Sequence, residues 1–197
     1  VYTVWDLGVS DAMSIGFYQL MGQEVRKIDY LEKTGEGLPY FIKKLQEKGY
    51  VYAKHFAPHD IKARELTSGK SRLEIAKSLG IEFEVIPDIP IQDGIDAGRA
   101  LFKKLWVDKD KCADWLRLIP QYTKEYDEDN KIFKNRPLHD WTSHGADEYR
   151  YAAVVIGKMT MEKKAAYTHY AESAMPTNTN PKVVDVPKRA FTYTPRL

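Results

Sequence analysis

The sequence predicts an α/β domain built on a mixed five-stranded sheet, with three antiparallel and two parallel strands and helices on its faces. Two observations lead to this prediction. Apolar and polar residues alternate along much of residues 1–31, and this two-residue period is typical of strands. From residue 38 onward, segments with helical spacing alternate with short apolar runs, an order that favours helical crossovers and parallel strands.

The first three strands are expected to form an antiparallel meander. The first strand leads into Asp6, and a second follows over residues 13–18. Gly22 interrupts the pattern, and a third strand is expected from Val25 to Leu31. Short connections between these runs are typical of hairpins, so the three strands should be neighbours in the sheet.

Helices and single strands are expected to alternate in the middle of the chain. Leu38, Phe41, Ile42 and Leu45 recur at helical spacing, and Gly49 stands where a glycine commonly ends a helix. The elements expected after it are a strand over 50–57 stopped by Pro58, a helix over 71–79, a strand over 81–86, a helix over 94–105, a short helix over 113–118 in the otherwise polar stretch 109–136, and a last helix over 143–158.

The length and composition fit one domain. The 197 residues, 43% of them hydrophobic, are enough to bury a core, which we expect over residues 1–170. Residues 171–197 are rich in Thr, Asn and Pro and lack a period, so an extended or disordered arm is predicted there. Because Val1 already lies in a strand-like pattern, the chain is expected to be a domain of a longer protein.

The composition indicates the cellular environment of the protein and says little about its reaction. Cys112 is the single cysteine, so no intrachain disulfide can form, which fits a reducing cytoplasm. There is no apolar run long enough to cross a membrane. The formal net charge is only +2, so a nucleic-acid partner would have to be met by local basic patches.

Three aspartates stand where predicted elements begin or end. Asp6 closes the first strand, Asp60 follows the fourth, and Asp147 lies near the start of the last helix. Ligands gather at the carboxyl ends of strands in open α/β sheets. If the first and fourth strands are neighbours, Asp6 and Asp60 project together and the helix brings Asp147 across the opening.

Three carboxylates in one small cleft favour a divalent cation. Two unit charges about 4 Å apart repel by roughly 4 kcal/mol at an effective dielectric of about 20. Protonation or a cation relieves this repulsion, and hard oxygen ligands suit Mg²⁺ or Mn²⁺. Two such ions roughly 3.5–4 Å apart can activate a water and stabilise the leaving oxygen of a phosphodiester.

Helical spacing places further polar residues on the stripe of Asp147. His144, Glu148 and Tyr151 share it, and His144 could accept a proton, contact a phosphate or bind a metal ion. Each aspartate taken singly is more often a turn or structural residue. The joint arrangement is what points to a site.

The ordered motifs resemble those of the nuclease half of phage terminase large subunits. They are Trp5-Asp6-Leu7-Gly8, Pro58-His59-Asp60, and the run from Ser143 to Tyr151 that reads Ser-His-Gly-Ala-Asp-Glu-Tyr-Arg-Tyr. Connecting elements such as Ser71-Arg72 and Pro137-Leu138-His139-Asp140 are also similar. The resemblance extends from about Val1 to about Ile156.

This resemblance implies a ribonuclease H-like fold and a two-metal endonuclease that cleaves double-stranded viral DNA concatemers during genome packaging, with Mg²⁺ or Mn²⁺. Asp6, Asp60 and Asp147 match the metal-binding acidic triad, and His144 matches a histidine near the metal. Glu148 replaces a small residue common in the family and is expected either to add a ligand or to face solvent. The resemblance also implies a packaging ATPase domain, absent from this chain, a small subunit and a portal as partners, in the cytoplasm of an infected host cell, with no membrane.

Basic residues near Asp60 are the expected contacts to DNA phosphates. They are Lys62, Arg64, Lys70 and Arg72. Gly69-Lys70-Ser71 is not a nucleotide-binding loop, because Arg64 stands where that motif requires a glycine. Arg26 and Lys27 lie where the resemblance implies a hairpin near DNA. Contacts to the DNA backbone would be salt-sensitive and largely independent of sequence.

Two alternatives remain at this point. Ribonuclease H-like folds also serve junction resolvases and nucleases of RNA–DNA hybrids, with similar acidic sites. A non-catalytic module that docks DNA or a portal is the other alternative.

Overall fold

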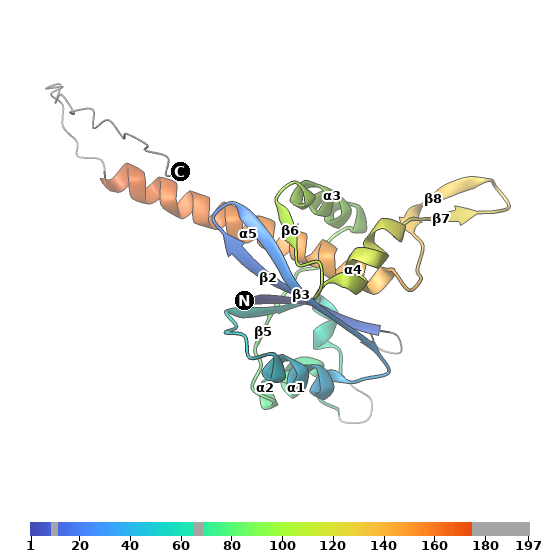
Figure 1. The fold of residues 1–197 in the computed structure, drawn as a ribbon, viewed down its shortest axis with the longest axis horizontal. Helices are drawn as coiled ribbons and strands as arrows, with labels where there is room; N and C mark the ends of the chain where they lie inside the picture. The colour runs from blue at the N-terminus through green and yellow to red at the C-terminus, as the bar shows by residue number, and fades with distance from the viewer. Residues whose placement is uncertain (9–11, 65–68, 175–197) are drawn as a thin grey trace, which may run out of the picture. The chain divides into compact units, whose positions relative to one another are not determined.

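The computed structural model describes residues 1–8, 12–64 and 69–174, and the chain divides into two units, Val1–Glu162 and Lys163–Leu197 (Figure 1). The domain described below is the first unit. The last helix, α5, runs from Ser143 to Ala174, four residues into the segment expected as an arm. The rest of that segment, residues 175–197, lies outside the described residues.

A six-stranded mixed sheet forms the centre of the domain, in the order β5-β4-β1-β2-β3-β6. Its strands are β1 (Tyr2–Asp6), β2 (Ala12–Met21), β3 (Glu24–Thr34), β4 (Lys54–Ala57), β5 (Phe83–Val85) and β6 (Leu105–Val107). The expected meander is confirmed, since β2 pairs antiparallel with both β1 and β3. The two parallel strands are confirmed as well, because β4 lies parallel to β1 and β5 parallel to β4.

The prediction of five strands was wrong by one. β6 pairs in parallel with the other edge of the meander, with Leu105 opposite Val25. Leu105 follows Phe102 at helical spacing, so the sequence pattern assigned it to the preceding helix. In the structure that helix, α3, ends at Phe102 and the chain turns directly into the strand.

The expected helices are present on the two faces of the sheet. One face carries α1 (Leu38–Lys48) and α2 (Arg72–Ser78), and the other carries α3 (Ile91–Phe102), α4 (Ala113–Leu118) and the first part of α5 (Figure 1). Gly49 caps α1 in the left-handed conformation at φ 66°, as its position predicted. Ser71 and Glu74 form a capping box at the start of α2.

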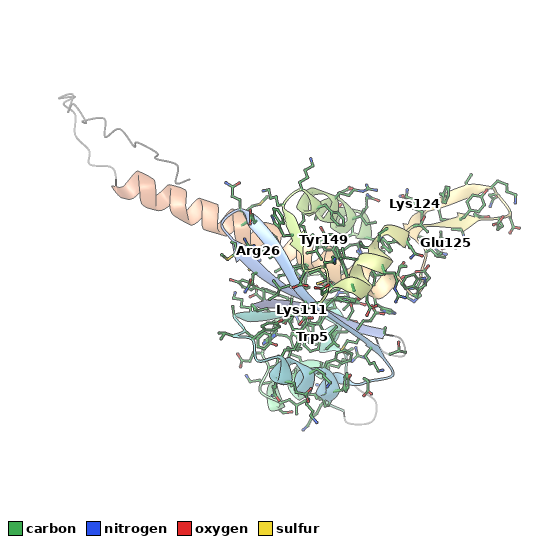
Figure 2. The ribbon with its side chains drawn as sticks, in the orientation of Figure 1. Trp5, Arg26, Lys111, Lys124, Glu125 and Tyr149 are labelled. Carbon is green, nitrogen blue, oxygen red and sulfur yellow. The ribbon has the colours of Figure 1, made fainter. Side chains whose placement is uncertain are left out.

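Two apolar cores result, one on each face of the sheet. Neighbouring residues of β1 point to opposite sides, so Val4 joins the core beneath α5 and Trp5 joins the core beneath α1. Trp5 and Tyr149, labelled in Figure 2, belong to the two different cores. In the described residues no helix is both long and apolar enough to cross a membrane.

A two-stranded hairpin, which the sequence did not predict, follows α4 and the short 3₁₀ helix η2 (Ile119–Gln121). Its strands are β7 (Lys124–Asp127) and β8 (Ile132–Pro137), and it projects away from the main sheet (Figure 1). Neither face of the hairpin packs on a core, and Ile132 and Phe133 are both exposed. Without a buried face the sequence carries no alternating pattern, which explains why residues 124–137 looked like a loop.

A buried ion pair joins α5 to the sheet. Lys27 Nζ of β3 lies 2.5 Å from Glu148 Oε2, and both side chains are fully buried. The Tyr18 hydroxyl donates to Glu148 Oε1 at 2.7 Å and accepts from Lys27 at 2.9 Å. Gly16 makes room for this group, because a Cβ there would overlap the Glu148 carboxylate. The expectation that Lys27 lies near DNA was therefore wrong, since its charge is used inside the protein.

Candidate active site

Asp6 and Asp60 lie at the same edge of the sheet. β1 and β4 are parallel neighbours, with Val4 opposite Phe56, so their carboxyl ends meet. Asp6 is the last residue of β1, and Asp60 lies in the 3₁₀ helix η1 (His59–Lys62) that follows β4. The expected neighbourhood of the first and fourth strands is confirmed.

The start of α5 is tied to this edge of the sheet by hydrogen bonds. Ser14 of β2, which pairs with Asp6, donates to the His144 carbonyl at 2.9 Å. The Trp115 indole donates to the Gly145 carbonyl at 3.1 Å. These bonds bring the His144 ring to Asp6, with Nδ1 and Oδ2 3.0 Å apart. Asp147 follows one helical turn later and thus faces the same edge.

The charges of Asp60 and Asp147 act on the Asp6 carboxylate. The pKa of Asp6 is raised to about 6, mainly by burial; the hydrogen bond with His144 opposes this shift, and the charges of Asp147 and Asp60 contribute to it. Burial also raises the pKa of Tyr151, and all three carboxylates contribute to that rise. Tyr151 therefore keeps its proton beside the acidic cluster and can act as a hydrogen-bond donor there.

The Asp147 carboxylate is held by an arginine of its own helix. Arg150 lies 2.7 Å away through Nη2 and 3.0 Å through Nε, and its side chain is buried. The Tyr122 hydroxyl, just after η2, donates to the same Asp147 oxygen at 3.5 Å. The Asp147 side chain is 29% exposed, against 7% for Arg150, so its carboxylate is accessible from solvent.

The donor set fits a divalent cation at Asp6 and Asp60. Asp60 Oδ1 is buried and has no hydrogen-bond partner in the described part of the chain, which is costly for a carboxylate oxygen. Burial also raises the pKa of Asp6, so the negative charge of its carboxylate is unfavourable without a cation. Among the described residues, no three His, Cys, Asp or Glu side chains already stand together at metal-ligand spacing. Asp147 would have to turn from Arg150 to complete a three-carboxylate set.

Replacing Asp6 by asparagine is expected to stabilise the metal-free protein at neutral pH. The folded-state pKa of about 6 lies above the ordinary value of 3.8, so stability falls as the pH rises between these values. The full penalty above pH 6 is about 3 kcal/mol, and Asp6→Asn removes it. Urea unfolding in EDTA at pH 4 and pH 7 measures the effect. The gain should grow between the two pH values, and a gain that stays constant contradicts the prediction.

The structure gathers most of the basic residues expected to contact DNA. Arg64 forms an isolated β-bridge with Ser71, so Arg64, Lys70 and Arg72 meet at the start of α2. Arg64 and Lys70 are exposed, and both help to lower the pKa of Glu74, after the stronger effect of its hydrogen bonds to Ser71. Lys62 is exposed at the end of η1, two residues after Asp60.

The sequence predicted that Glu148 either adds a metal ligand or faces solvent. Both predictions were wrong, because Glu148 is buried and pairs with Lys27. One residue along a helix rotates the side chain by about 100°, which turns Glu148 inward to Lys27 while Asp147 stays accessible from solvent. Three further residues of the site received no role from the sequence: Tyr122, Arg150 and Tyr151. Helical spacing was the available signal for two of them, because Arg150 and Tyr151 lie three and four residues after Asp147.

Comparison with solved structures shows the same fold in large terminases. The large terminase of the thermophilic bacteriophage D6E aligns with a TM-score of 0.60 and 18% identity, over 79% of this chain and 39% of that protein. The nuclease domain of the large terminase g2p from bacteriophage SPP1, solved with bound Mn, aligns with a TM-score of 0.58 and 16% identity, over 76% and 82% of the two chains. No family model and no curated protein matches the sequence. The ribonuclease H-like fold expected from the motifs is confirmed, and this chain spans well under half of the D6E protein.

Proposed function

We propose that this chain is the nuclease domain of a phage terminase large subunit and cleaves double-stranded DNA with divalent metal ions. The observation that carries the proposal is that Asp6 and Asp60 follow two parallel neighbouring strands to one edge of the sheet, where hydrogen bonds also hold the start of α5, the helix of Asp147. The SPP1 nuclease domain, which has the same fold, was solved with bound Mn. The ordered motifs and the fold thus support the same chemistry.

In the proposed mechanism Asp6, Asp60 and Asp147 hold Mg²⁺ or Mn²⁺, with two ions as the expected number. The bound ions lower the pKa of a water and offset the charge that develops on the phosphodiester. His144 orients the Asp6 carboxylate through its ring nitrogen and can take up a proton. Tyr151 remains protonated beside the cluster, so its hydroxyl can donate to a phosphate oxygen.

We assign duplex binding to contacts between basic side chains and the phosphate backbone of the DNA. Lys62, Arg64, Lys70 and Arg72 lie on η1 and at the start of α2, the segment that follows Asp60 in the chain. Guanidinium and ammonium groups there can neutralise phosphates without reading bases. In the whole protein we assign the domain to cleavage of viral DNA concatemers in the host cytoplasm, with an ATPase domain, a small subunit and a portal as partners.

Incubation of supercoiled plasmid with the purified chain in Mn²⁺, Mg²⁺ or EDTA tests the proposal. Nicking and linearisation are expected with either metal and not in EDTA, and Asp60→Ala should be inactive. Asp129→Ala is the matched control, because Asp129 is an exposed aspartate in the turn between β7 and β8, away from the sheet edge that carries Asp6 and Asp60. Absence of cleavage in both metals, or equal cleavage by Asp60→Ala, would overturn the proposal.

A further inference from the structure

A cavity of about 440 Å³ opens beside Asp147 and has no role in the mechanism above. Tyr122 and Arg150 line it, and both side chains also bind the Asp147 carboxylate. The cavity is therefore one side chain away from the Asp147 carboxylate. A molecule that fills the cavity would contact the two residues that hold Asp147.

Three aromatic side chains line the cavity, together with aliphatic residues and two arginines. Phe102 of α3 and Tyr149 of α5 pack with ring centres 4.8 Å apart, and Tyr122 adds a third ring. The Tyr149 hydroxyl donates to the Gly98 carbonyl at 2.9 Å, which fixes the ring, and Gly98 allows the close approach of the two helices. Phe102 remains 46% exposed, so an aromatic face is available to a ligand.

Basic side chains extend from the cavity toward the base of the β7–β8 hairpin. Arg99 stands on its wall beside Arg150. A second hollow of about 320 Å³ shares Ile95, Arg99 and Tyr122 with it and adds Lys124 and Arg136 at the base of the hairpin. Three of these cations already have acidic partners: Arg99 pairs with Asp96, Arg136 with Glu125, and Arg150 with Asp147. Lys124 contacts the neutral Asn135 side chain and keeps its positive charge available. The combined groove carries cations along its length and aromatic rings at the end near Asp147.

We propose that this groove binds an unpaired nucleotide of the DNA strand next to the bond that is cleaved. The base stacks on Phe102 and Tyr122, and the strand's phosphates follow Arg99 toward Lys124. Aromatic rings bind any base through its π-face, and guanidinium groups suit phosphates. A paired base cannot enter such a cavity, so the nucleotide must leave the duplex stack, at a cost of a few kcal/mol. The inference rests on the proposed nuclease function, which supplies the DNA strand at Asp147.

The test uses binding rather than cleavage, in an Asp60→Asn background with Ca²⁺ so that the DNA survives. Fluorescence anisotropy measures affinity for a single-stranded oligonucleotide, and 2-aminopurine placed along a duplex reports the unstacking of one base. Phe102→Ala and Arg99→Ala should each weaken single-strand binding, by about 5- to 150-fold for the stacking residue. Phe102→Ala should also abolish the 2-aminopurine signal. Trp106→Ala and Lys104→Ala, an exposed aromatic and an exposed cation outside both hollows, are the matched controls.

The possible outcomes separate this inference from the proposed function. Unchanged affinity and an unchanged 2-aminopurine signal in Phe102→Ala and Arg99→Ala overturn it, even if the wild-type chain cuts plasmid. Weakened binding in both variants supports it, even if the wild-type chain cuts nothing. A free deoxynucleoside monophosphate that competes as well as the oligonucleotide also overturns it, because the ligand would then be a free nucleotide. Circular dichroism should not change in either variant, and Mn²⁺ affinity should not change when either substitution is made in the otherwise wild-type chain.

Discussion

Asp60→Asn is expected to lower the rate of plasmid cleavage by about a thousandfold or more. Metal-ion catalysis contributes several kcal/mol to the transition state, and each 1.4 kcal/mol, roughly, is a tenfold change in rate. Asp60 is the aspartate whose buried oxygen has no other partner among the described residues, so its oxygen is the one most available to a cation. Asparagine keeps the shape of the side chain and removes the charge.

Metal binding should be lost together with cleavage. Calorimetric titration with Mn²⁺ is expected to show binding to the wild-type chain and strongly weakened binding to Asp60→Asn. Asp129→Asn, which changes an exposed carboxylate in the turn between β7 and β8, should bind and cleave as the wild type does. If Asp60→Asn lost cleavage but kept its full Mn²⁺ affinity, Asp60 would not be a metal ligand, and its role would need another explanation.

Lys27→Met is expected to destabilise the protein by about 3–5 kcal/mol. The substitution leaves the fully buried Glu148 carboxylate without its counter-ion, and breaking a buried pair from one side has a cost of this size. Burial already lowers the pKa of Lys27 and raises that of Glu148, while each charge opposes the shift of the other. Lys27 also lies 4.7 Å from the centre of the Trp115 ring, so its removal disturbs the core beneath α5.

A double substitution separates the charge from the packing. Lys27→Met combined with Glu148→Leu should recover most of the lost stability in urea unfolding, because apolar pairs often replace buried ion pairs without loss. Glu148→Leu alone should be as harmful as Lys27→Met. A Lys27→Met variant within 1 kcal/mol or so of the wild type contradicts the prediction. The Lys27–Glu148 pair holds α5 against the sheet one residue from Asp147, so we also expect slower cleavage in the single variants.

Much of the fold could be predicted from the sequence because its elements have one buried face. The strand ending at Asp6 and the strand before Asp60 were recognisable from apolar runs, and their pairing follows from the order of helices and strands. β6 and the hairpin were missed for a physical reason. β6 is only three residues long and its first residue, Leu105, continues the spacing of the helix before it, whereas the hairpin buries no face.

The site was only partly predictable because its partners are far apart in sequence. The strand ends and the helix start pointed to Asp6, Asp60 and Asp147. Nothing local indicates that Glu148 meets Lys27, 121 residues earlier, rather than a metal ion or water. Tyr122 lies in a weakly periodic stretch, and only the packing of η2 against α5 brings its hydroxyl to Asp147.

Anomalous diffraction from crystals of the chain grown with Mn²⁺ would test the central claim most directly. The expected result is a pair of Mn²⁺ peaks roughly 4 Å apart, bound by Asp6 and Asp60, with the Asp147 carboxylate turned from Arg150 toward them. The contradicting result is a crystal with saturating Mn²⁺ that shows no peak between Asp6 and Asp60 and in which Asp147 still pairs with Arg150. The protein would then not be a metal-dependent nuclease centred on these three aspartates.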